Sequence, residues 1–522
     1  MPHPKVARGN RHPTLAGMTL PFPGRAADSA RLADITRILA RHGLGWLAAR
    51  FMPGSGAAET PDGDPATTPR RVRLALEELG PAWIKLGQIL ATRADLLPAP
   101  WIAELEQLQS QAPTLPFAAL RPDLEQALGA PLETCFATFD ETPLAAASMA
   151  QVHRATLPDG TPVAVKIRRP GITGPMLADL RLIAGAAALA ERTNAQARQL
   201  RAGAMAAELA DALRQELDFT VEGRNADRLR ADFARNPRVV VPTIHWPLSS
   251  ESVLVMDFVA GVAPTSSQAL RDAGIDPASI AALGADVVLD MVLINGRFHG
   301  DPHPGNLRCL PGNAIALLDL GLVGQVSPRR REEFIRFTQA LVARDDAAMA
   351  DVLTTWDESG SAPASAVAAA ARRLVETHGG ESLRLAPMVA DFLPLLRETG
   401  IVMPSDLLLI FKALVTIDGV LSRIEPGFEL SAALRRSTLR LVAARLSPDH
   451  WQPILRALGL ELAHLGNEAP RLLRAGVQRL TEPPAPIEPA PQWAALVRPL
   501  TRAIWGAGVL VAVAVVASRL IG

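Results

Sequence analysis

Short strand-like runs are concentrated between residues 132 and 322, and this stretch constrains the fold more than any other part of the sequence. In residues 161–167 apolar side chains alternate with others, which is the period of a half-buried strand. Two continuous apolar runs of strand length, 252–259 and 314–320, lie in the same stretch. The patterns before and after it are mostly helical. The sequence therefore predicts an α+β fold with helical regions on either side of a strand-bearing centre.

The basic residues are unusually biased towards arginine. The 522-residue chain has 53 basic and 53 acidic side chains, so it has no net positive field, and we expect no nucleic-acid partner. Only four of the 53 basic residues are lysine: Lys5, Lys85, Lys166 and Lys412. Because ammonium and guanidinium groups make different contacts, each of these lysines is a candidate for a specific role.

An uncharged apolar segment lies near the end of the sequence. Residues 503–518 follow a Pro-rich stretch at 481–492, and their sixteen residues span roughly 24 Å as a helix. We expect one C-terminal transmembrane anchor, although this length is less than the ~30 Å hydrocarbon layer. A buried C-terminal helix is the alternative. Arg498 and Arg502 precede the segment and favour a cytoplasmic body.

A Gly- and Pro-rich loop at 298–306 carries an acid and an amide. Asp301 and Asn306 are five residues apart, and Asp319 follows thirteen residues after Asn306, at the end of an apolar strand. Carboxylate and amide oxygens hold the divalent cations that accompany polyphosphates, while a separate carboxylate faces the acceptor. We assign Asn306 and Asp319 to Mg²⁺ and Asp301 to the catalytic carboxylate. A kinase catalytic loop followed by Asp-x-Gly has this order.

Lys166 lies on the alternating strand, on the face opposite the apolar residues. A kinase lysine in this place contacts the α- and β-phosphates and needs a carboxylate partner from a helix. Glu216, Asp218 and Glu222 supply three acids within seven residues of a helical region. On one continuous helix the backbone winds about 240° beyond a full turn between Glu216 and Glu222. Their side chains would therefore face different directions and can serve two different cations.

The order of these motifs resembles the UbiB/ADCK family of atypical kinases. The matching segments cover roughly residues 31–322 and are Lys85-Leu86-Gly87-Gln88, Ala145-Ala146-Ala147-Ser148, Val163-Ala164-Val165-Lys166, Glu216-Leu217-Asp218, Glu222 with Asn225, the loop from His299 to Asn306, and Asp319-Leu320-Gly321.

The resemblance implies an ATP site with Mg²⁺. It implies catalytic roles for Asp301, Lys166 and Glu222, with Glu222 paired to Lys166. Lys85 and Gln88 would lie over the nucleotide pocket and face Glu216 and Asp218. The implied nucleotide-binding residues are Ala145, Ala146, Ala147, Ser148, Val152, Lys166 and Met256.

The fold that we expect is α+β and protein-kinase-like, with two lobes, an N-terminal helical extension, a helical C-terminal region and a C-terminal transmembrane helix. The predicted divisions are a flexible lead-in (1–30), the helical extension with the Lys-x-Gly-Gln signature (31–130), an N-lobe with a helical insert (131–260), a helical C-lobe with the catalytic and metal-binding loops (261–480), a Pro-rich linker (481–492) and a membrane anchor (493–522).

Two features distinguish this sequence from a protein kinase. Alanines stand where a kinase phosphate loop has glycines, so the backbone is more restricted and the loop should hold nucleotide differently. Only about ten residues separate Asp319 from the charged helix near Arg329. A protein kinase needs a longer activation segment there to dock a polypeptide, so we do not expect a protein substrate.

We expect a membrane-anchored, Mg²⁺-dependent ATP-binding kinase or ATPase that supports ubiquinone biosynthesis on the cytoplasmic face of the bacterial inner membrane. It would act on a small or lipid molecule, and a membrane lipid, a polyprenyl quinone precursor or other ubiquinone biosynthesis proteins are the expected partners. A homodimer is left open. The alternatives are a nucleotide-regulated lipid-binding accessory factor or chaperone, and a phosphotransferase for small metabolites.

The remaining candidates receive structural interpretations. His299 and His303 are four apart, but Pro302 and Pro304 exclude the regular helix on which that spacing would suit zinc. Two cysteines, Cys135 and Cys309, have no partner motif and exclude a disulfide-rich secreted domain. Lys412 lies in an apolar helical stretch and is interpreted as a surface or snorkelling lysine.

Overall fold

The computed structural model of the chain describes residues 26–45, 67–91, 93, 97–108, 113–194, 197–198, 201–380, 385–428 and 433. The predicted Pro-rich linker and the predicted membrane anchor lie outside the described residues, as does nearly all of the predicted lead-in.

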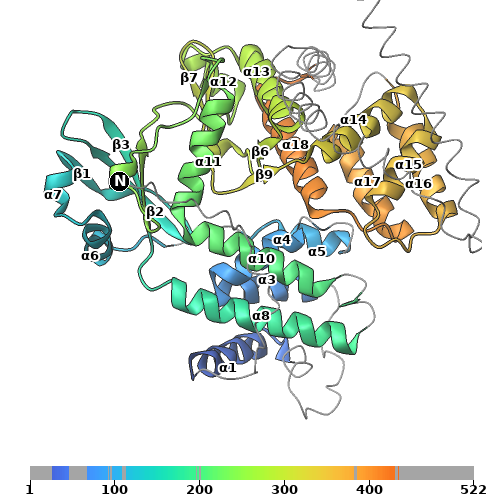
Figure 1. Cartoon of the computed structure of the whole chain (residues 1–522), viewed down its shortest axis with the longest axis horizontal. Helices are drawn as coiled ribbons and strands as arrows, with labels where there is room; N and C mark the ends of the chain where they lie inside the picture. Colours follow the sequence, from blue (N-terminus) through green and yellow to red (C-terminus); the bar gives the residue numbers. More distant parts are fainter. Residues whose placement is uncertain are drawn as a thin grey trace, which may run out of the picture. The chain divides into compact units, whose positions relative to one another are not determined.

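Helices form the N-terminal extension (Figure 1). Gly80 adopts a φ of 100°, which favours glycine, and Pro81 begins the next helix because proline suits a first helical position. The break between α3 and α4 therefore follows from the backbone preferences of these two residues. The described helices of this region are α1 (Ala26–Arg41), α3 (Thr68–Leu79), α4 (Pro81–Ala91) and α5 (Ala99–Leu105).

The N-lobe contains a four-stranded antiparallel sheet in the order β1-β2-β3-β5. Its strands are β1 (Thr138–Ala146), β2 (Ala150–Thr156), β3 (Pro162–Arg168) and β5 (Val253–Asp257). Val163, Val165 and Ile167 are buried on one face of β3 and pack in one core with helices α6 (Phe117–Leu128) and α7 (Leu132–Cys135). This core includes residues before position 131, which is the predicted start of the N-lobe.

Three helices follow β3: α8 (Thr173–Thr193), α10 (Ala202–Leu217) and α11 (Phe219–Asp232). α8 and α10 pack together through a separate apolar cluster (Figure 1). The expectation of one continuous helix through Glu216 and Glu222 is wrong. α10 ends at Leu217, and the Asp218 side chain accepts a hydrogen bond from the Thr220 N–H and caps α11, so the two glutamates lie on different helices.

The C-lobe places short strands beside a buried helix, α13 (Pro277–Asp290), which continues as a π-helical turn at Met291–Asn295. The strands form one sheet in the order β4-β8-β7 and one antiparallel pair, β6 with β9. The strands are β4 (Val239–Val240), β6 (Arg297–His299), β7 (Leu307–Leu310), β8 (Ala314–Leu317) and β9 (Val323–Gln325). A short helix, α12 (Ser267–Asp272), precedes α13.

Five helices complete the described part: α14 (Pro328–Ala343), α15 (Asp346–Trp356), α16 (Ala364–His378), α17 (Leu385–Thr399) and α18 (Ser405–Ile424). Four of these helices contribute buried aromatic rings that pack against one another in stacked, tilted and edge-on pairs: Phe334, Phe337, Trp356, Phe392 and Phe411. α18 also packs against α13, so this aromatic cluster joins the apolar core beneath the catalytic loop.

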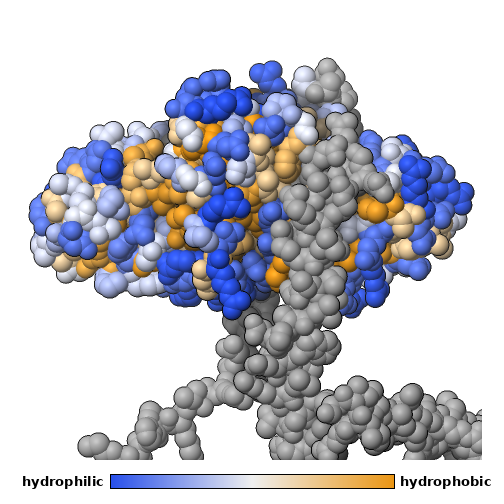
Figure 2. All heavy atoms as spheres, turned by 90° about the horizontal axis from the view of Figure 1, so that it is seen from above, coloured by the Kyte–Doolittle hydropathy of each residue, from blue (hydrophilic) through white to orange (hydrophobic). Residues whose placement is uncertain are grey.

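Within the described residues, one helix is long and apolar enough to cross a membrane, the segment Pro277–Asn295. It lies in mid-chain and 67% of it is buried in the structure. Its side chains belong to the C-lobe core, which accounts for its apolar character without a membrane. On the face shown in Figure 2, hydrophobic residues gather towards the middle, between hydrophilic residues at its margins.

Candidate functional site

A cleft of about 800 Å³ brings together residues of the N-terminal extension, the N-lobe, the α8–α10 insert and the C-lobe. Lys85, Lys166, Asp301, Asn306 and Asp319 all line it. These residues are far apart in the sequence, so the fold alone assembles them.

Lys166 lies at the centre of the charged cluster. Its Nζ is 2.8 Å from Glu222 Oε2 and 3.5 Å from Asp319 Oδ1. The β3 pleat directs Lys166 to the face opposite Val165, and the first turn of α11 supplies Glu222. The structure therefore contains the Lys166–Glu222 pair that the resemblance implies. Phe219 supports the ammonium, with its ring centroid 5.3 Å from Nζ.

The charges of this cluster are strongly coupled. Burial disfavours the charged form of Lys166, but the neighbouring charges of Asp319 and Glu222 outweigh burial and raise the pKa of Lys166. The ammonium of Lys166 lowers the pKa of Asp319, against the opposing effect of burial. Both groups are therefore charged at neutral pH.

Asp319 is held in a conformation that few residues other than glycine adopt. Its φ is 46°, in the left-handed region, and its side chain is 54% exposed to the cleft. The Asn225 side chain donates a 3.1 Å hydrogen bond to the Leu320 carbonyl, which fixes the backbone directly after Asp319. Strained backbone of this kind costs about 1–3 kcal/mol and persists where the surroundings impose it. Here the strain aims the carboxylate into the cleft.

The backbone after Asp319 turns directly into a strand. β9 pairs with β6, and a Cβ atom at Gly324 would lie 2.4 Å from the Phe298 ring, so only glycine fits this close pairing. α14 begins at Pro328, with Ser327 as its N-cap. The prediction that a helix follows Asp319 after about ten residues is confirmed, and this part of the chain contains no long segment on which a polypeptide substrate could dock.

His299 connects the catalytic loop to the strand that precedes Asp319. Its Nε2 is 3.1 Å from the Leu318 carbonyl oxygen, and its Nδ1 accepts a hydrogen bond from the Asp301 N–H at 3.2 Å. This pair of contacts requires a neutral ring with its proton on Nε2. Burial lowers the pKa of His299, which favours that neutral form. His299 therefore positions Asp301.

Asp301 and Asn306 are held by their own loop. The Asn306 side-chain amide donates a 3.1 Å hydrogen bond to the Asp301 carbonyl, which leaves its Oδ1 atom for another ligand. His303 accepts a hydrogen bond from the Gly305 N–H at 2.9 Å, and its Nε2 lies 4.0 Å from Asp301 Oδ2.

The alanine-rich loop forms the tight turn between β1 and β2. The Ala147 N–H donates to the Ala150 carbonyl at 2.8 Å, and the Arg169 guanidinium donates to the Ala147 carbonyl, also at 2.8 Å. Ala147 and Ser148 line the cleft. No residue from Ala145 to Ser148 has a positive φ, so this turn needs no glycine. Arg169 has no motif that would have identified it from sequence.

The other nucleotide-binding candidates are placed by the sheet register. Ala145 pairs with Val152 and Ala146 with Gln151, both at the start of the β1–β2 hairpin. Val152 pairs with Lys166, while Met256 pairs with Ala164, two residues from Lys166 on the same strand. Val152 and Met256 are half-buried on the face of the sheet that carries Lys166. This face offers an apolar surface for a flat ring beside the phosphate-binding lysine.

The Lys-x-Gly-Gln signature on α4 contacts Glu216 as expected, but Asp218 has another partner. Lys85 forms an ion pair with Glu216 and lines the cleft. The Gln88 side chain donates a 3.2 Å hydrogen bond to the Leu108 carbonyl, and it also lines the cleft. Asp218 caps α11 instead of facing Lys85, because its carboxylate accepts from the N–H and hydroxyl of Thr220.

The structure adds Lys412 to the cleft, a position that the interpretation as a surface or snorkelling lysine did not indicate. It is half-buried on α18 and lines the same cleft as Lys85 and Lys166. The clue in the sequence was the scarcity of lysine, but the local pattern of an apolar helix does not indicate which face carries the cleft.

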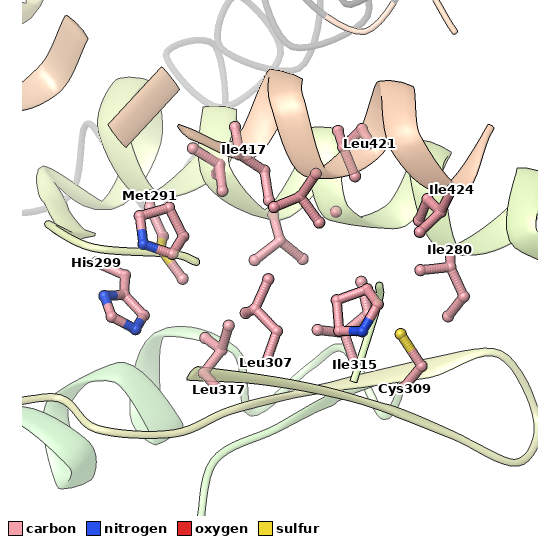
Figure 3. Close-up of a pocket in the computed structure, with 16 residues that line it drawn as sticks. Ile280, Met291, His299, Leu307, Cys309, Ile315, Leu317, Ile417, Leu421 and Ile424 are labelled. Carbon is pink, nitrogen blue, oxygen red and sulfur yellow. The ribbon is translucent and has the colours of Figure 1, made fainter. Parts of the chain in front are cut away.

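A second, smaller cavity of about 20 Å³ lies behind the catalytic loop (Figure 3). Apart from the His299 ring its lining is apolar, with Leu307, Ile315 and Leu317 from the strands facing Ile417 and Leu421 of α18. Burial raises the pKa of the Cys309 thiol in this lining to about 11, so that thiol is unreactive at neutral pH. This packing anchors the catalytic loop on its far side.

The charged cluster fits a divalent cation bound together with phosphate. Asp319 offers an exposed carboxylate and Asn306 an amide oxygen, the two oxygen types that such cations accept, and phosphate oxygens and water complete magnesium sites of this kind. Within the described residues, no group of three or more His, Cys, Asp or Glu side chains forms a metal site from protein ligands alone.

Two segments of the chain match known domains. Residues 107–353 match the ABC1 atypical kinase-like domain, and residues 377–429 match the UbiB helical domain. Among solved structures, the complex of Rv3197 with erythromycin from Mycobacterium tuberculosis has 23% sequence identity and a TM-score of 0.46, covering 69% of this chain and 92% of that chain.

Curated relatives extend over most of the sequence. A protein of Xanthomonas campestris pv. campestris (strain B100) named "Probable protein kinase UbiB" is 34% identical over 431 residues, which cover 79% of this chain and 77% of the relative. A protein of the same name from Pseudomonas paraeruginosa (strain DSM 24068 / PA7) is 32% identical over 434 residues, covering 81% of this chain and 80% of the relative. With both domains matched in order as well, this chain belongs to the UbiB family of atypical kinases.

Proposed function

We propose that this protein is a Mg²⁺-dependent ATP-binding kinase or ATPase that supports ubiquinone biosynthesis and acts on a small or lipid molecule. The observation that carries the proposal is the convergence of Lys166, Glu222 and Asp319 with the loop residues Asp301 and Asn306 in one cleft. Each residue has the chemistry that phosphoryl transfer requires, and the fold brings them together from four separate segments.

The residues divide the work in a definite way. Lys166 would bind phosphate oxygens, and Glu222 holds its ammonium in place. Asn306 and Asp319 would hold Mg²⁺, which neutralises developing negative charge on the phosphates when it is bound. Asp301 would orient the attacking hydroxyl or water and accept its proton. His299 keeps the backbone of Asp301 in place through its Nδ1 atom.

A small or lipid acceptor is favoured over a protein. The segment between Asp319 and α14 is short and paired with β6, and residues of α4 and α5 line the cleft together with the catalytic loop. We further propose that the C-terminal apolar segment, 503–518, anchors the protein in the inner membrane, with the catalytic body on the cytoplasmic face.

Quinone profiling of a deletion strain tests this function in the cell. Complementation with the wild-type gene should restore ubiquinone, whereas Asp301→Asn and Asp319→Asn should not. Asp351→Asn, at an exposed position on α15, is the matched control and should behave as wild type. Full restoration by both Asp301→Asn and Asp319→Asn would contradict an enzymatic role. Restoration by Asp301→Asn alone would favour the accessory or chaperone function, in which nucleotide only sets conformation.

A further inference from the structure

Lys412 has an unusual environment for a basic residue of this chain. Three of the four lysines line the large cleft. Lys85 is paired with Glu216, and Lys166 is paired with Glu222 and Asp319. Lys412 has no hydrogen bond or ion pair with any other residue that the structure describes. Its half-buried side chain therefore lines the cleft without a partner among the described residues.

The surface around Lys412 is mainly apolar. Residues spaced three and four apart on α18 line the cleft, so one face of that helix forms its wall: Ser405, Leu408, Leu409, Lys412, Val415 and Thr416. Asp406 and Phe411 flank this stripe and line the cleft as well. The stripe extends over twelve residues, about 18 Å of helix. α17 adds Val389 and Leu393, four residues apart and thus on one face of that helix.

The opposite side of the cleft comes from α4, α5 and α10, which lie across from α18 (Figure 1). It carries Ile89, Ile102 and Met205 as further half-buried apolar side chains. Its acids Glu106 and Glu208 are exposed and form no ion pair with Lys412. Asp406, six residues before Lys412 on α18, is held by Arg330 at 3.0 Å.

We propose that this part of the cleft, which we call the α18 site (Lys412 with Val389, Leu393, Leu408, Leu409 and Val415), binds a small amphipathic molecule with one anionic group. The Lys412 ammonium holds the phosphate or carboxylate of this molecule, and its apolar body packs on the stripes of α17 and α18. Small-molecule sites have this composition, an apolar lining with a few placed polar groups. The apolar surroundings lower the local dielectric and strengthen the charge interaction.

This inference rests on the proposed function in one respect, because it places the second ligand of the enzyme in the same cleft as the nucleotide. It differs from the proposed function in the binding site that it assigns. The nucleotide site is built from β2, β3 and the loops that carry Asp301 and Asp319, whereas the α18 site is built from the two helices of the C-terminal helical domain.

Lysine-selective acylation tests the inference, because the four lysines can be followed in one peptide map of the full chain. The probes are decyl phosphate and decanoate below their micelle concentrations, with decanol as the neutral match. We expect Lys412 to react in the free protein, and decyl phosphate or decanoate to slow that reaction about tenfold while decanol does not. Protection by decyl phosphate alone would show that the site selects a phosphate group. Protection by both decyl phosphate and decanoate would show that it accepts anions in general.

Calorimetry with variants supplies the matched comparison. Lys412→Gln should weaken binding of decyl phosphate about tenfold or more. Arg423→Gln, at an exposed position on the same helix and outside the cleft, should leave it unchanged. Thermal unfolding of both variants shows that each is folded. Leu409→Glu places a charge in the apolar stripe and should weaken binding of decyl phosphate and decanol alike.

Several outcomes would overturn the inference. If Lys412 did not react in the free protein, it would already have a partner. If Lys412→Gln and Arg423→Gln bound decyl phosphate with equal affinity, Lys412 would not belong to the site. Protection of Lys412 by Mg²⁺-ATP alone would make it part of the nucleotide site. A protein that binds decyl phosphate through Lys412 but shows no Mg²⁺-dependent ATP binding would contradict the proposed function and leave the α18 site intact.

Discussion

The two lysine–glutamate pairs of the cleft have the same chemistry but different surroundings. In the Lys166–Glu222 pair the side chains are 14% and 7% exposed, and Asp319 adds a third charge. In the Lys85–Glu216 pair they are 19% and 24% exposed, and the pair connects α4 of the extension to the end of α10. The first pair lies inside the charged cluster, and the second joins two separate helical regions.

This difference shows how one chain uses the same ion pair for two purposes. A buried pair is costly to break, because the remaining charge has neither water nor a partner. A pair with more access to water contributes less to stability, since water can replace either partner. We therefore interpret Lys166–Glu222 as part of the phosphate-binding machinery and Lys85–Glu216 as a contact that holds α4 over the cleft. Asp218, one residue after α10 ends, makes this possible by separating the helices that carry the two glutamates.

The largest effect is expected from breaking the buried pair. Lys166→Met leaves Glu222 buried without a cation, which should lower the free energy of unfolding by about 3 kcal/mol. Loss of a preorganised charge at the phosphates should also reduce ATP turnover about 100-fold. Denaturant unfolding and a coupled ATPase assay measure these two effects.

The double variant Lys166→Met with Glu222→Leu is the control for this comparison. It removes both charges, so most of the lost stability should return while ATP turnover stays low. If the single and double variants were equally stable, the burial of Glu222 would not matter, and the distinction between the two pairs would fail.

The buried histidines and the buried acid Glu222 contribute to the pH dependence of stability with opposite signs. Burial raises the pKa of Glu222, so protonation of this acid favours the folded state as the pH falls. Burial lowers the pKa values of His153 in the N-lobe and His299 in the C-lobe. At these two positions the unfolded chain binds protons more readily, so their contribution lowers stability as the pH drops below ~6.5, by at most about 1.4 kcal/mol per pH unit for each histidine.

His299→Asn checks the source of this slope. The variant should flatten the decrease in unfolding free energy between pH 7 and pH 5, as measured by denaturant titration at several pH values. A slope that is unchanged in this variant would assign the effect to other groups, and a steeper decrease in the variant than in the wild type would contradict the sign of the His299 shift.

The smallest effect is expected from the Lys85–Glu216 pair, which has more access to water than Lys166–Glu222. Lys85→Met should lower the free energy of unfolding by only about 0.5 kcal/mol, because both side chains keep contact with water. It should increase hydrogen exchange in α4 and at the end of α10, where the pair joins the two regions, and leave exchange in β3 unchanged. A loss of stability equal to that of Lys166→Met would show that the pairs are not different in kind.

Local patterns predicted the parts of the fold that local physics determines. The alternation of Val163, Val165 and Ile167 places Lys166 on the opposite face, and the structure has that arrangement. Gly80 and Pro81 predict a helix boundary because of their backbone preferences, and the boundary is there. The acids and the amide of the catalytic loop could be assigned because Mg²⁺ and phosphate require those atoms in that order.

The features that sequence missed depend on contacts between distant segments. The helix break at Asp218 was hidden, because a capping box needs an acid three residues after the cap and Val221 stands there. The φ of 46° at Asp319 follows from contacts with α11, which no neighbouring residue specifies. The place of Lys412 in the cleft could not be predicted, because only the packing of α18 against the rest of the C-lobe decides which of its faces lines the cleft.

Mg²⁺-dependent ATP binding by the full chain tests the central claim most directly. Calorimetry should show ATP binding that depends on Mg²⁺ in the wild type and in the exposed-site control Asp351→Asn. Asp319→Asn should weaken binding about tenfold or more and remove its dependence on Mg²⁺, because the carboxylate that Lys166 keeps ionised is then absent. ATP binding that is equally strong and equally Mg²⁺-dependent in both variants would contradict the assignment of this cleft as a nucleotide site.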